Sequence, residues 1–508
     1  MLRPVPHVSA EQLASGERAL VQDLAWASLC GAFSGGVILV AFALTLGATP
    51  LQIGLLAAIP FLAQASQLPA TLLIERVRLR RRIGVLSVTA ARLVILATAV
   101  LPFIGGGFAL TALIGAQVLI ATFNAVGGCA INSWLHQLIP HERLGHFFSR
   151  RLFFGTALAC VGTLIAGRMV DAAPRGQPMY AYAAAFALAG LAGFVSSWHL
   201  GRAPEPAMSA GAPAGRALER LRQPFTHPNF RRLLIFLAAW TIASNFTAPF
   251  LTVYLIEQLG YPVGTVTSLW VTSQVSNALT LYLWGRLSDR LSNKGVLAVA
   301  LPVHFACVLA LVFVDAVSGA RGQLGLLYVL HFVMGIATGG IALATGNLGL
   351  KLAPQGEGTV YLAAIGLASA VAGGIAPVLA GALAQAFQTS ELSAVVRWQS
   401  PGHWKEMAIF SFAHWEFLFA ISALLGLYVI HALYRIEEGR EVSERQVVQA
   451  FVFEARRSLN SLSSAAFEGL FPFERLNERR KWWRSERRRL REPPRWPEQR
   501  ILDRRRSA

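Results

Sequence analysis

The sequence predicts an all-α membrane protein in which twelve transmembrane helices form two pseudo-symmetric six-helix bundles. Three observations carry this prediction. The 508-residue chain is 54% hydrophobic and only 14% charged, whereas soluble domains carry about 25% charged residues. Apolar segments of the roughly 20 residues that a helix needs to cross a bilayer recur along the chain. Residues that are uncommon in membrane helices also recur at a constant offset between the first and second halves.

Twelve apolar segments follow one another along the chain. The expected spans are residues 24–46, 52–74, 83–105, 108–135, 152–172, 179–200, 231–257, 264–284, 295–316, 324–350, 359–387 and 409–434. They divide the chain into a cytoplasmic N-terminal segment (1–23), a six-helix bundle (24–201), a cytoplasmic linker rich in Pro, Ala and Gly (202–230), a second bundle (231–434) and a basic cytoplasmic tail (435–508). Residues 9–23 predict a short amphipathic helix, and residues 388–405 a long external loop.

An internal repeat relates the two bundles. The same number of positions, 214, separates Glu75 from Asp289, Trp26 from Trp240, Pro140 from Pro354, and Gly167 from Gly381. Chance would account for the glycines alone, but not for the tryptophans, the prolines and the acid–Arg pairs together. The repeat indicates two homologous halves related by an axis along the membrane normal, an arrangement found in transporters.

Basic residues predict the orientation. With an even number of spans, both termini lie on one side, and that side carries 39 of the 45 Lys and Arg residues. The opposite loops hold only Arg175, Arg321, Arg397 and Lys405. The positive-inside rule then places both termini in the cytoplasm, and we expect the protein in an inner (plasma) membrane. The net charge of +18 follows from topology and tail, so no nucleic-acid partner is predicted.

One turn between two spans, Gly285–Lys294, reads Gly-Arg-Leu-Ser-Asp-Arg-Leu-Ser-Asn-Lys. It resembles the loop signature of the major facilitator superfamily, which runs Gly-x-Leu-Ser/Ala-Asp-Arg and ends in basic residues; Asn293 stands where the family usually has Arg. A fainter copy lies at Thr71–Arg80. The resemblance covers roughly residues 20–435. The overall pattern is similar to that of uncharacterised bacterial members, so it indicates no single cargo. The resemblance implies a transporter that moves a small-molecule substrate by alternating access, secondary active or facilitative.

The resemblance also implies that these turns close the cytoplasmic side of the cavity when it faces outward. A carboxylate beside the N-terminus of a neighbouring helix meets unpaired N–H groups and a positive dipole end. Exposed ion pairs between Arg and acid would add about 1 kcal/mol each. The predicted cytoplasmic gate consists of Glu75, Arg76, Arg143, Arg150, Gly285, Asp289 and Arg290. Ordinary turn charges that obey the positive-inside rule are the alternative interpretation.

By the same resemblance, spans one, four, seven and ten line the central cavity. Polar residues deep in these spans are candidates, because unpaired polar groups in lipid are costly. The substrate-cavity candidates are Gln117, Asn124, Trp240, Ser244, Asn245, His331 and Thr338. His331 and Asn245 come first among them, and the offset of 214 pairs Gln117 with His331 and Asn124 with Thr338. Interhelical hydrogen bonding, typically under about 1 kcal/mol, is the alternative for each taken singly.

Arg92 is the one charge predicted near mid-membrane. It lies about 15 Å along the helix axis from Arg82, where a charge is costly and marks a functional candidate. Structural ion pairing is the favoured interpretation, and contact with an anionic substrate the second. No Asp or Glu is expected at the centre of a span, so His331 is the residue whose titration would suit proton coupling.

The remaining patterns predict no chemistry. There is no phosphate-binding Gly-rich loop and no nucleophile–base pair, and His136, His141 and His146 are spaced unsuitably for a metal. We therefore expect no enzyme, catalytic residue, cofactor or metal, and a monomer. The tail carries 19 basic and 12 acidic residues and either contacts the anionic lipid leaflet or extends into solvent. The alternative function is a transporter-like membrane assembly or sensing protein that acts through this tail.

Overall fold

The computed structural model describes residues 4–5, 8–104, 106–140, 143–174, 177–208, 222–315, 317, 319–354, 358–400, 403–439 and 445–454. The chain divides into two compact units, Met1–Val447 and Val448–Ala508. All membrane helices belong to the first unit. Most of the basic tail, from residue 455 onward, lies outside the described residues.

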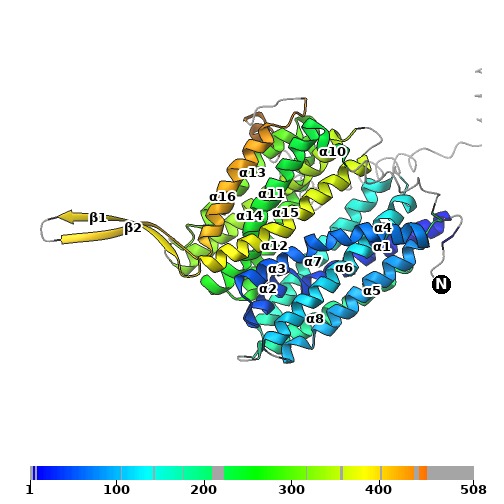
Figure 1. The fold of residues 1–508 in the computed structure, drawn as a ribbon, viewed down its shortest axis with the longest axis horizontal. Coiled ribbons are helices and arrows are strands. Elements are labelled where there is room, and N and C mark those ends of the chain that lie inside the picture. The colour runs from blue at the N-terminus through cyan, green and yellow to red at the C-terminus, as the bar shows by residue number, and fades with distance from the viewer. Residues whose placement is uncertain are drawn as a thin grey trace, which may run out of the picture. The chain divides into compact units, whose positions relative to one another are not determined.

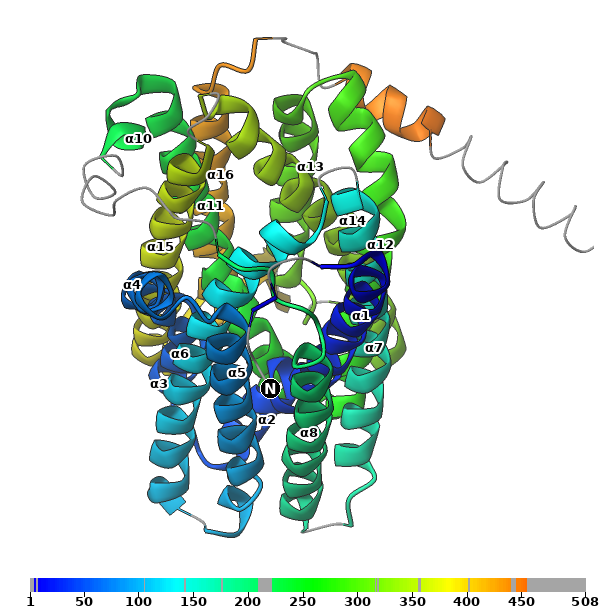
Figure 2. The same cartoon turned by 90° about the vertical axis from the view of Figure 1, so that its right-hand side faces the viewer.

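The first half supplies six spans, several of them built from two helices. They are α1 (Ala10–Ser34) with α2 (Gly36–Thr45); α3 (Pro50–Leu62) with the 3-10 turn η1 (Ala63–Ser66) and α4 (Gln67–Val77); α5 (Arg80–Thr98) with η2 (Leu101–Phe103); α6 (Gly106–Leu138); α7 (Leu144–Asp171); and α8 (Pro178–Leu200). Figure 2 shows these helices, coloured blue to teal, as one group.

The second half repeats the plan. After the short α10 (Gln223–Thr226) come α11 (Pro228–Val253) with the π-helical turn η5 (Tyr254–Gln258), α12 (Val263–Arg290), α13 (Asn293–Leu311), α14 (Ala320–Leu352), α15 (Gly358–Ala386), the strands β1 (Glu391–Ser400) and β2 (His403–Ala413), and α16 (Glu416–Tyr434). These helices form the green to orange group in Figures 1 and 2.

Eleven helices within the described residues are long and apolar enough to cross a membrane, and they match eleven of the expected spans. The remaining one, α12, has 28 residues, which is about 42 Å of helix and long enough to cross. Its Ser and Thr residues lower its hydropathy, but they are bonded within the helix: the Thr272 hydroxyl donates to the Ser268 carbonyl at 2.9 Å, and that of Thr280 to Ser276 at 2.7 Å. A span with satisfied hydroxyls can lie among other helices.

The first span begins earlier than expected and is broken in the middle. Ser9 caps α1 through a reciprocal pair of hydrogen bonds with Gln12, so the amphipathic segment expected at residues 9–23 is continuous with the span. The helix then stops at Gly35, and α2 begins at Gly36, whose φ of 52° lies in the left-handed region. Glycine reaches that region without steric cost, so the Gly-Gly pair sets the break.

The loop expected at residues 388–405 is a β-hairpin instead. Its strands pair antiparallel from Glu391 with Ala413 to Ser400 with His403, and it extends away from the helices in Figure 1. Residues 409–413, expected in the last span, therefore belong to β2, and α16 starts at Glu416. A short apolar run fits a strand as well as a helix, and here strand pairing decides.

The halves meet along two helix pairs, α3 with α15 and α7 with α12. Gly381 of α15 lies against Pro50 and Leu51, while Gly167 of α7 lies against Gly264 and Thr267, with no room for a Cβ in either place. The offset of 214 that relates Gly167 to Gly381 also relates Pro50 to Gly264. Each bundle therefore packs a small residue against the first turn of the equivalent helix in the other, which confirms the pseudo-symmetry predicted from the repeat. Small residues permit such close helix approach in membranes.

The two membrane faces are distinguished by the elements that lie on them. The hairpin side carries the β-hairpin and the first turns of α3 and α12. The linker side is the opposite face, where α4 and α12 end. The Gly167 and Gly381 contacts both lie on the hairpin side, whereas α4, which continues α3 toward the linker side, packs mainly on α6 of its own half.

Candidate functional site

A cavity of about 270 Å³ lies among α11, α12, α13 and α14, and is closed on one side by Val37 of α2. We call it the C-half pocket. Its walls are mostly apolar, with two tryptophans, Trp240 and Trp270. Its polar side chains are five hydroxyls and two imidazoles: Ser244, Thr247, Thr252, Ser273, Thr338, His304 and His331. Concave, mainly apolar sites with a few polar groups are typical of small-molecule binding.

Four of the seven predicted cavity residues line this pocket, namely Trp240, Ser244, His331 and Thr338. The others do not. Asn245 is on α11 but donates from Nδ2 to the Thr241 carbonyl at 2.8 Å, and Gln117 and Asn124 lie half-buried on α6 in the first half. The structure therefore separates Gln117 and Asn124 from their repeat equivalents.

The polar groups that line the pocket bond mainly within their own helices. Ser244 donates to the Thr241 carbonyl at 3.3 Å, and Thr338 to the Gly335 carbonyl at 3.1 Å. Nδ1 of His331 lies 2.8 Å from the Leu327 carbonyl. A carbonyl only accepts, so Nδ1 carries a proton, and Nε2 is an acceptor when the imidazole is neutral. These residues need no interhelical partner and keep hydrogen-bonding capacity for a ligand.

Sequence reasoning missed His304 and Thr247, which also line the pocket. Both are buried, and within the described part of the chain neither His304 Nδ1 nor Thr247 Oγ1 has a hydrogen-bond partner. The His304 ring meets Trp240 edge to face, with centroids 5.1 Å apart. A histidine within an apolar span is a signal that the sequence offered, but it lies in the ninth span, outside the four expected to line the cavity.

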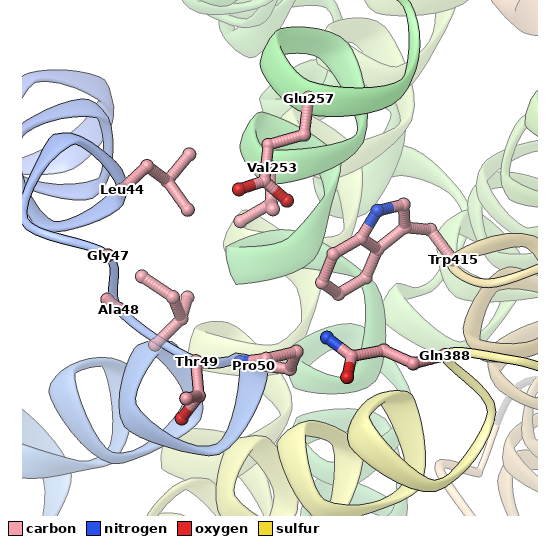
Figure 3. Close-up of a pocket in the computed structure, with 10 residues that line it drawn as sticks. Leu44, Gly47, Ala48, Thr49, Pro50, Val253, Glu257, Gln388 and Trp415 are labelled. Carbon is pink, nitrogen blue, oxygen red and sulfur yellow. The ribbon is translucent and has the colours of Figure 1, made fainter.

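A second pocket, of about 300 Å³, lies on the hairpin side where the halves meet. Figure 3 shows the α2–α3 turn on one side of it, facing Val253, Glu257 and Trp415 of the second half on the other. Its lining residues are Leu44, Gly47, Ala48, Thr49, Pro50, Ile53, Val253, Glu257, Gln388 and Trp415. Glu257 belongs to the π-helical turn η5, a geometry frequent at functional sites.

One hydrogen bond joins the halves close to this junction. Asp171, the last residue of α7, accepts from the backbone N–H of Gly264 at 2.8 Å. The N-cap position of α12 is Pro262, which provides no side-chain cap. Asp171 therefore supplies from the first half the cap that α12 lacks, at the positive end of that helix.

The predicted gate residues lie on the linker side and are largely exposed. They are Glu75 and Arg76 in α4, Arg143 and Arg150 at the start of α7, and Gly285, Asp289 and Arg290 near the end of α12. Gly285 is half-buried and the other six are exposed. Among the described residues, neither Glu75 nor Asp289 forms an ion pair. Asp289 lines a polar cavity of about 490 Å³ with residues of its own half. The gate stays a prediction.

The signature turn does have a defined partner within each half. Glu205, which follows α8, accepts from the backbone N–H of Arg80 at 2.7 Å and lies 3.5 Å from Nε of the same residue. Glu438, which follows α16, accepts from the backbone N–H groups of Lys294 at 2.6 Å and Asn293 at 3.1 Å. Arg80 and Lys294 are repeat equivalents. The basic end of the signature thus begins the third helix of each half, and a glutamate caps that helix.

The Glu438 carboxylate is stabilised in its charged form. Burial acts to raise the pKa of Glu438, but hydrogen bonds from Lys294, Asn293 and Lys351 outweigh that effect and lower the pKa below its ordinary value. The Lys351 ammonium lies 3.0 Å from Oε1 of Glu438. Sequence reasoning missed both capping glutamates, although an Arg-x-x-Glu pattern follows the sixth helix of each half.

Arg92 lies inside the first half, where its side chain crosses Gly193. The nearby Asp23, which precedes the expected first span (24–46), is buried within α1. Asp23 pairs with Arg151 at 3.3 Å and accepts from the Ser196 hydroxyl at 2.7 Å. Arg92 is close enough for its charge to act on Asp23. This arrangement is a buried charged cluster within one bundle, outside the C-half pocket.

The described residues contain no group of His, Cys, Asp and Glu suited to a metal ion. The four cysteines lie within helices and are free thiols.

Comparison with known proteins identifies the family. The sequence model of the Major Facilitator Superfamily matches residues 24–377. No curated protein sequence matches. The fold is similar to the crystal structure of the nucleoside transporter NupG (12% identity, 84% of this chain and 98% of that one, TM-score 0.61). It is also similar to a bacterial homologue of the iron transporter ferroportin in an inward-facing state (15%, 85% and 100%, 0.60). A variant of the peptide transporter POT in complex with alafosfalin is similar as well (14%, 85% and 99%, 0.59). With that family match over most of its length and a fold shared with these transporters, the chain belongs to the major facilitator superfamily of membrane transporters.

Proposed function

We propose that this protein carries a small solute across the membrane by alternating access, as a secondary active or facilitative transporter. The observation that carries the proposal is the pair of equivalent contacts on the hairpin side, Gly167 against α12 and Gly381 against α3. They join the two halves through small residues, and packed helices that meet in this way can slide or rock against one another.

We further propose that the linker side is cytoplasmic, that the membrane is a bacterial inner membrane, and that the predicted gate closes the linker side when the hairpin side opens. The exposure of Glu75 and Asp289 supports the gate, because groups that pair in one state of a transporter are free in the other. The basic residues that flank the spans on this side support the orientation.

The fold does not select a solute. The similar structures are those of a nucleoside transporter, a homologue of an iron transporter and a peptide transporter. The C-half pocket supports a small cargo, because its volume of about 270 Å³ is below the range of about 300–1,000 Å³ of drug-sized sites.

Reconstitution into proteoliposomes tests transport directly. Solutes are screened with and without an imposed pH gradient, and flux above that of protein-free liposomes is the expected result. Asp289→Ala is expected to lower the flux while the protein stays in the membrane. Glu11→Ala, which removes an exposed acid from the first turn of α1, is the control and should leave flux unchanged. Unaltered flux in Asp289→Ala would remove that residue from the gate.

Removal of the tail tests the alternative function, an assembly or sensing protein. Val447 is fully buried in the first unit, so the truncation is placed after residue 454. A transporter keeps its flux without the tail. A full-length protein that moves no solute, but whose cellular phenotype is lost on truncation, would favour the alternative.

A further inference from the structure

We infer that the C-half pocket is the solute site, and that its ligand is an uncharged ring compound with at least one N–H or O–H donor. This inference rests on the proposed transport function and adds the chemical class of the cargo.

The pocket excludes ions by its composition. Its lining, all within the described residues, contains no Asp, Glu, Lys or Arg. A buried ion without a partner carries a large desolvation penalty even after relaxation of the protein. A carboxylate or an ammonium group would find no fixed countercharge here, whereas a neutral molecule keeps its affinity.

The pocket also favours a polar ligand over a purely apolar one. Thr247 is 3% exposed and His304 is 6% exposed, and Oγ1 of the first and Nδ1 of the second lack hydrogen-bond partners in the described part of the chain. Leaving such buried groups unpaired is unfavourable. A ligand whose binding turns these side chains toward it and pairs them removes that penalty. In the neutral form of His331, Nδ1 donates to the Leu327 carbonyl and Nε2 is an acceptor, which pairs with a donor on the ligand.

Aromatic walls point to a ring. Trp240 meets two adjacent rings of α13 edge to face, His304 at 5.1 Å and Phe305 at 5.8 Å, and these contacts orient its indole before a ligand arrives. Trp270 contributes a second indole to the lining. Fixed aromatic side chains favour stacked or edge-to-face contact with a ring. A volume of about 270 Å³ equals about nine water molecules at 30 Å³ each, enough for a single ring with a small substituent.

The pocket is connected to the movement of the halves. Val37, the residue from the first half in its lining, follows directly on the Gly35–Gly36 break between α1 and α2. Discontinuous helices line the binding sites of other transporters. A displacement of the first half moves Val37 and changes this wall, as a solute site in an alternating-access transporter requires.

Three probes with the same ring and different charge test the inference: benzamide (neutral), benzoate (anionic) and benzylamine (cationic). Binding to the purified full-length protein is measured by titration calorimetry at neutral pH. Benzamide, which carries both an N–H donor and a carbonyl acceptor, is expected to bind at least about tenfold more tightly than either ion.

Two variants connect binding to the pocket. Thr247→Val and His304→Phe preserve shape and remove the two unpartnered groups, and each should weaken benzamide binding about fivefold. Thr241→Val is the matched control, because Thr241 lies on the same helix, donates to the Leu237 carbonyl at 2.8 Å and does not line the pocket. Its binding should equal that of the wild type. Unfolding temperatures show that each variant is folded.

The inference is overturned if an ion binds as tightly as benzamide, if none of the three probes binds, or if the folded Thr247→Val and His304→Phe variants bind benzamide as the wild type does. The transport proposal fails separately. Benzamide binding without flux of any solute in proteoliposomes would contradict transport but keep the ligand class. Preferential flux of charged solutes would keep transport and discard the class.

Discussion

Asp171 is predicted to act as a latch between the halves on the hairpin side. Replacement by Ala removes the bond to Gly264 at 2.8 Å and a carboxylate at the positive end of α12. Hydrogen bonds to charged groups contribute about 1.5–3 kcal/mol, and a carboxylate at a helix N-terminus about 0.3–1 kcal/mol. Because Asp171 is exposed to solvent, which weakens both contributions, we take about 1 kcal/mol for the two together, below the sum of these ranges. That value shifts the equilibrium toward the state that is open on the hairpin side about fivefold.

Cysteine labelling measures this shift. Ala48 lines the pocket at the junction of the halves, so Ala48→Cys, in a protein whose four native cysteines are replaced by Ser, reports opening through its rate of reaction with a maleimide. Asp171→Ala should raise that rate about fivefold. Asp171→Asn keeps one acceptor oxygen and should raise it less.

The repeat provides the control. Gln385 of α15 is the repeat equivalent of Asp171, because 214 positions separate the two residues. As Asp171 lies at the first turn of α12, Gln385 corresponds to the first turn of α3. That turn has its own capping box from Thr49 and Gln52, so Gln385→Ala should leave labelling unchanged. The reasoning is refuted if Asp171→Ala labels at the unmodified rate, or if both variants accelerate labelling equally.

Three further predictions follow from described contacts. Glu438→Gln should lower the unfolding temperature at neutral pH. The difference in unfolding temperature should vanish as pH falls. A carboxyl whose pKa is lowered in the folded state contributes stability above the pKa of the unfolded carboxyl, and this stability is lost as pH falls through the folded pKa. Thermal unfolding of both proteins in an acidic pH series measures the difference. Gly381→Val should prevent closure of the hairpin side and accelerate labelling, while Gly115→Val, at a position with open space around it, should not. Asp23→Asn should destabilise the first bundle by about 3–5 kcal/mol, because it leaves Arg151 without its counter-ion; if adding Arg151→Met restores no thermal stability, the pair is not coupled.

Much of the architecture was predictable because it depends on period and length. Apolar runs of bilayer length fix the spans, and the repeat at 214 positions predicted the equivalence of Gly167 and Gly381 that the packing confirms. Boundaries were less predictable. The helix expected at residues 9–23 is continuous with the first span, because the capping box at Ser9 starts a single helix, α1, that runs from Ala10 to Ser34. The first residues of the expected last span belong to strand β2 instead, because they pair with β1. Such pairing is non-local, so a hydropathy pattern does not reveal it.

The site was predictable only in part. Trp240 and His331 are polar or aromatic residues in spans that the family resemblance singled out, and they line the C-half pocket. His304 was missed because its helix is not among the four spans expected to line the cavity, and the approach of α13 to α11 depends on packing that no local sequence pattern predicts. The capping glutamates were missed because their partners are backbone N–H groups, which every residue except proline has, so no residue type marks the partner. Only the recurrence of Arg202–Glu205 as Arg435–Glu438 marks them.

The two capping glutamates also determine how each bundle is anchored to the chain beyond it. Glu205 lies at the start of the linker and Glu438 at the start of the tail, and each accepts hydrogen bonds from the third helix of its bundle. A force applied to the linker or to the tail is therefore shared between the third and the sixth helix of a bundle, and it does not displace the sixth helix alone. Extra residues inserted after position 208 leave the hydrogen bond between Glu205 and Arg80 intact. The same residues inserted between positions 200 and 205 break it.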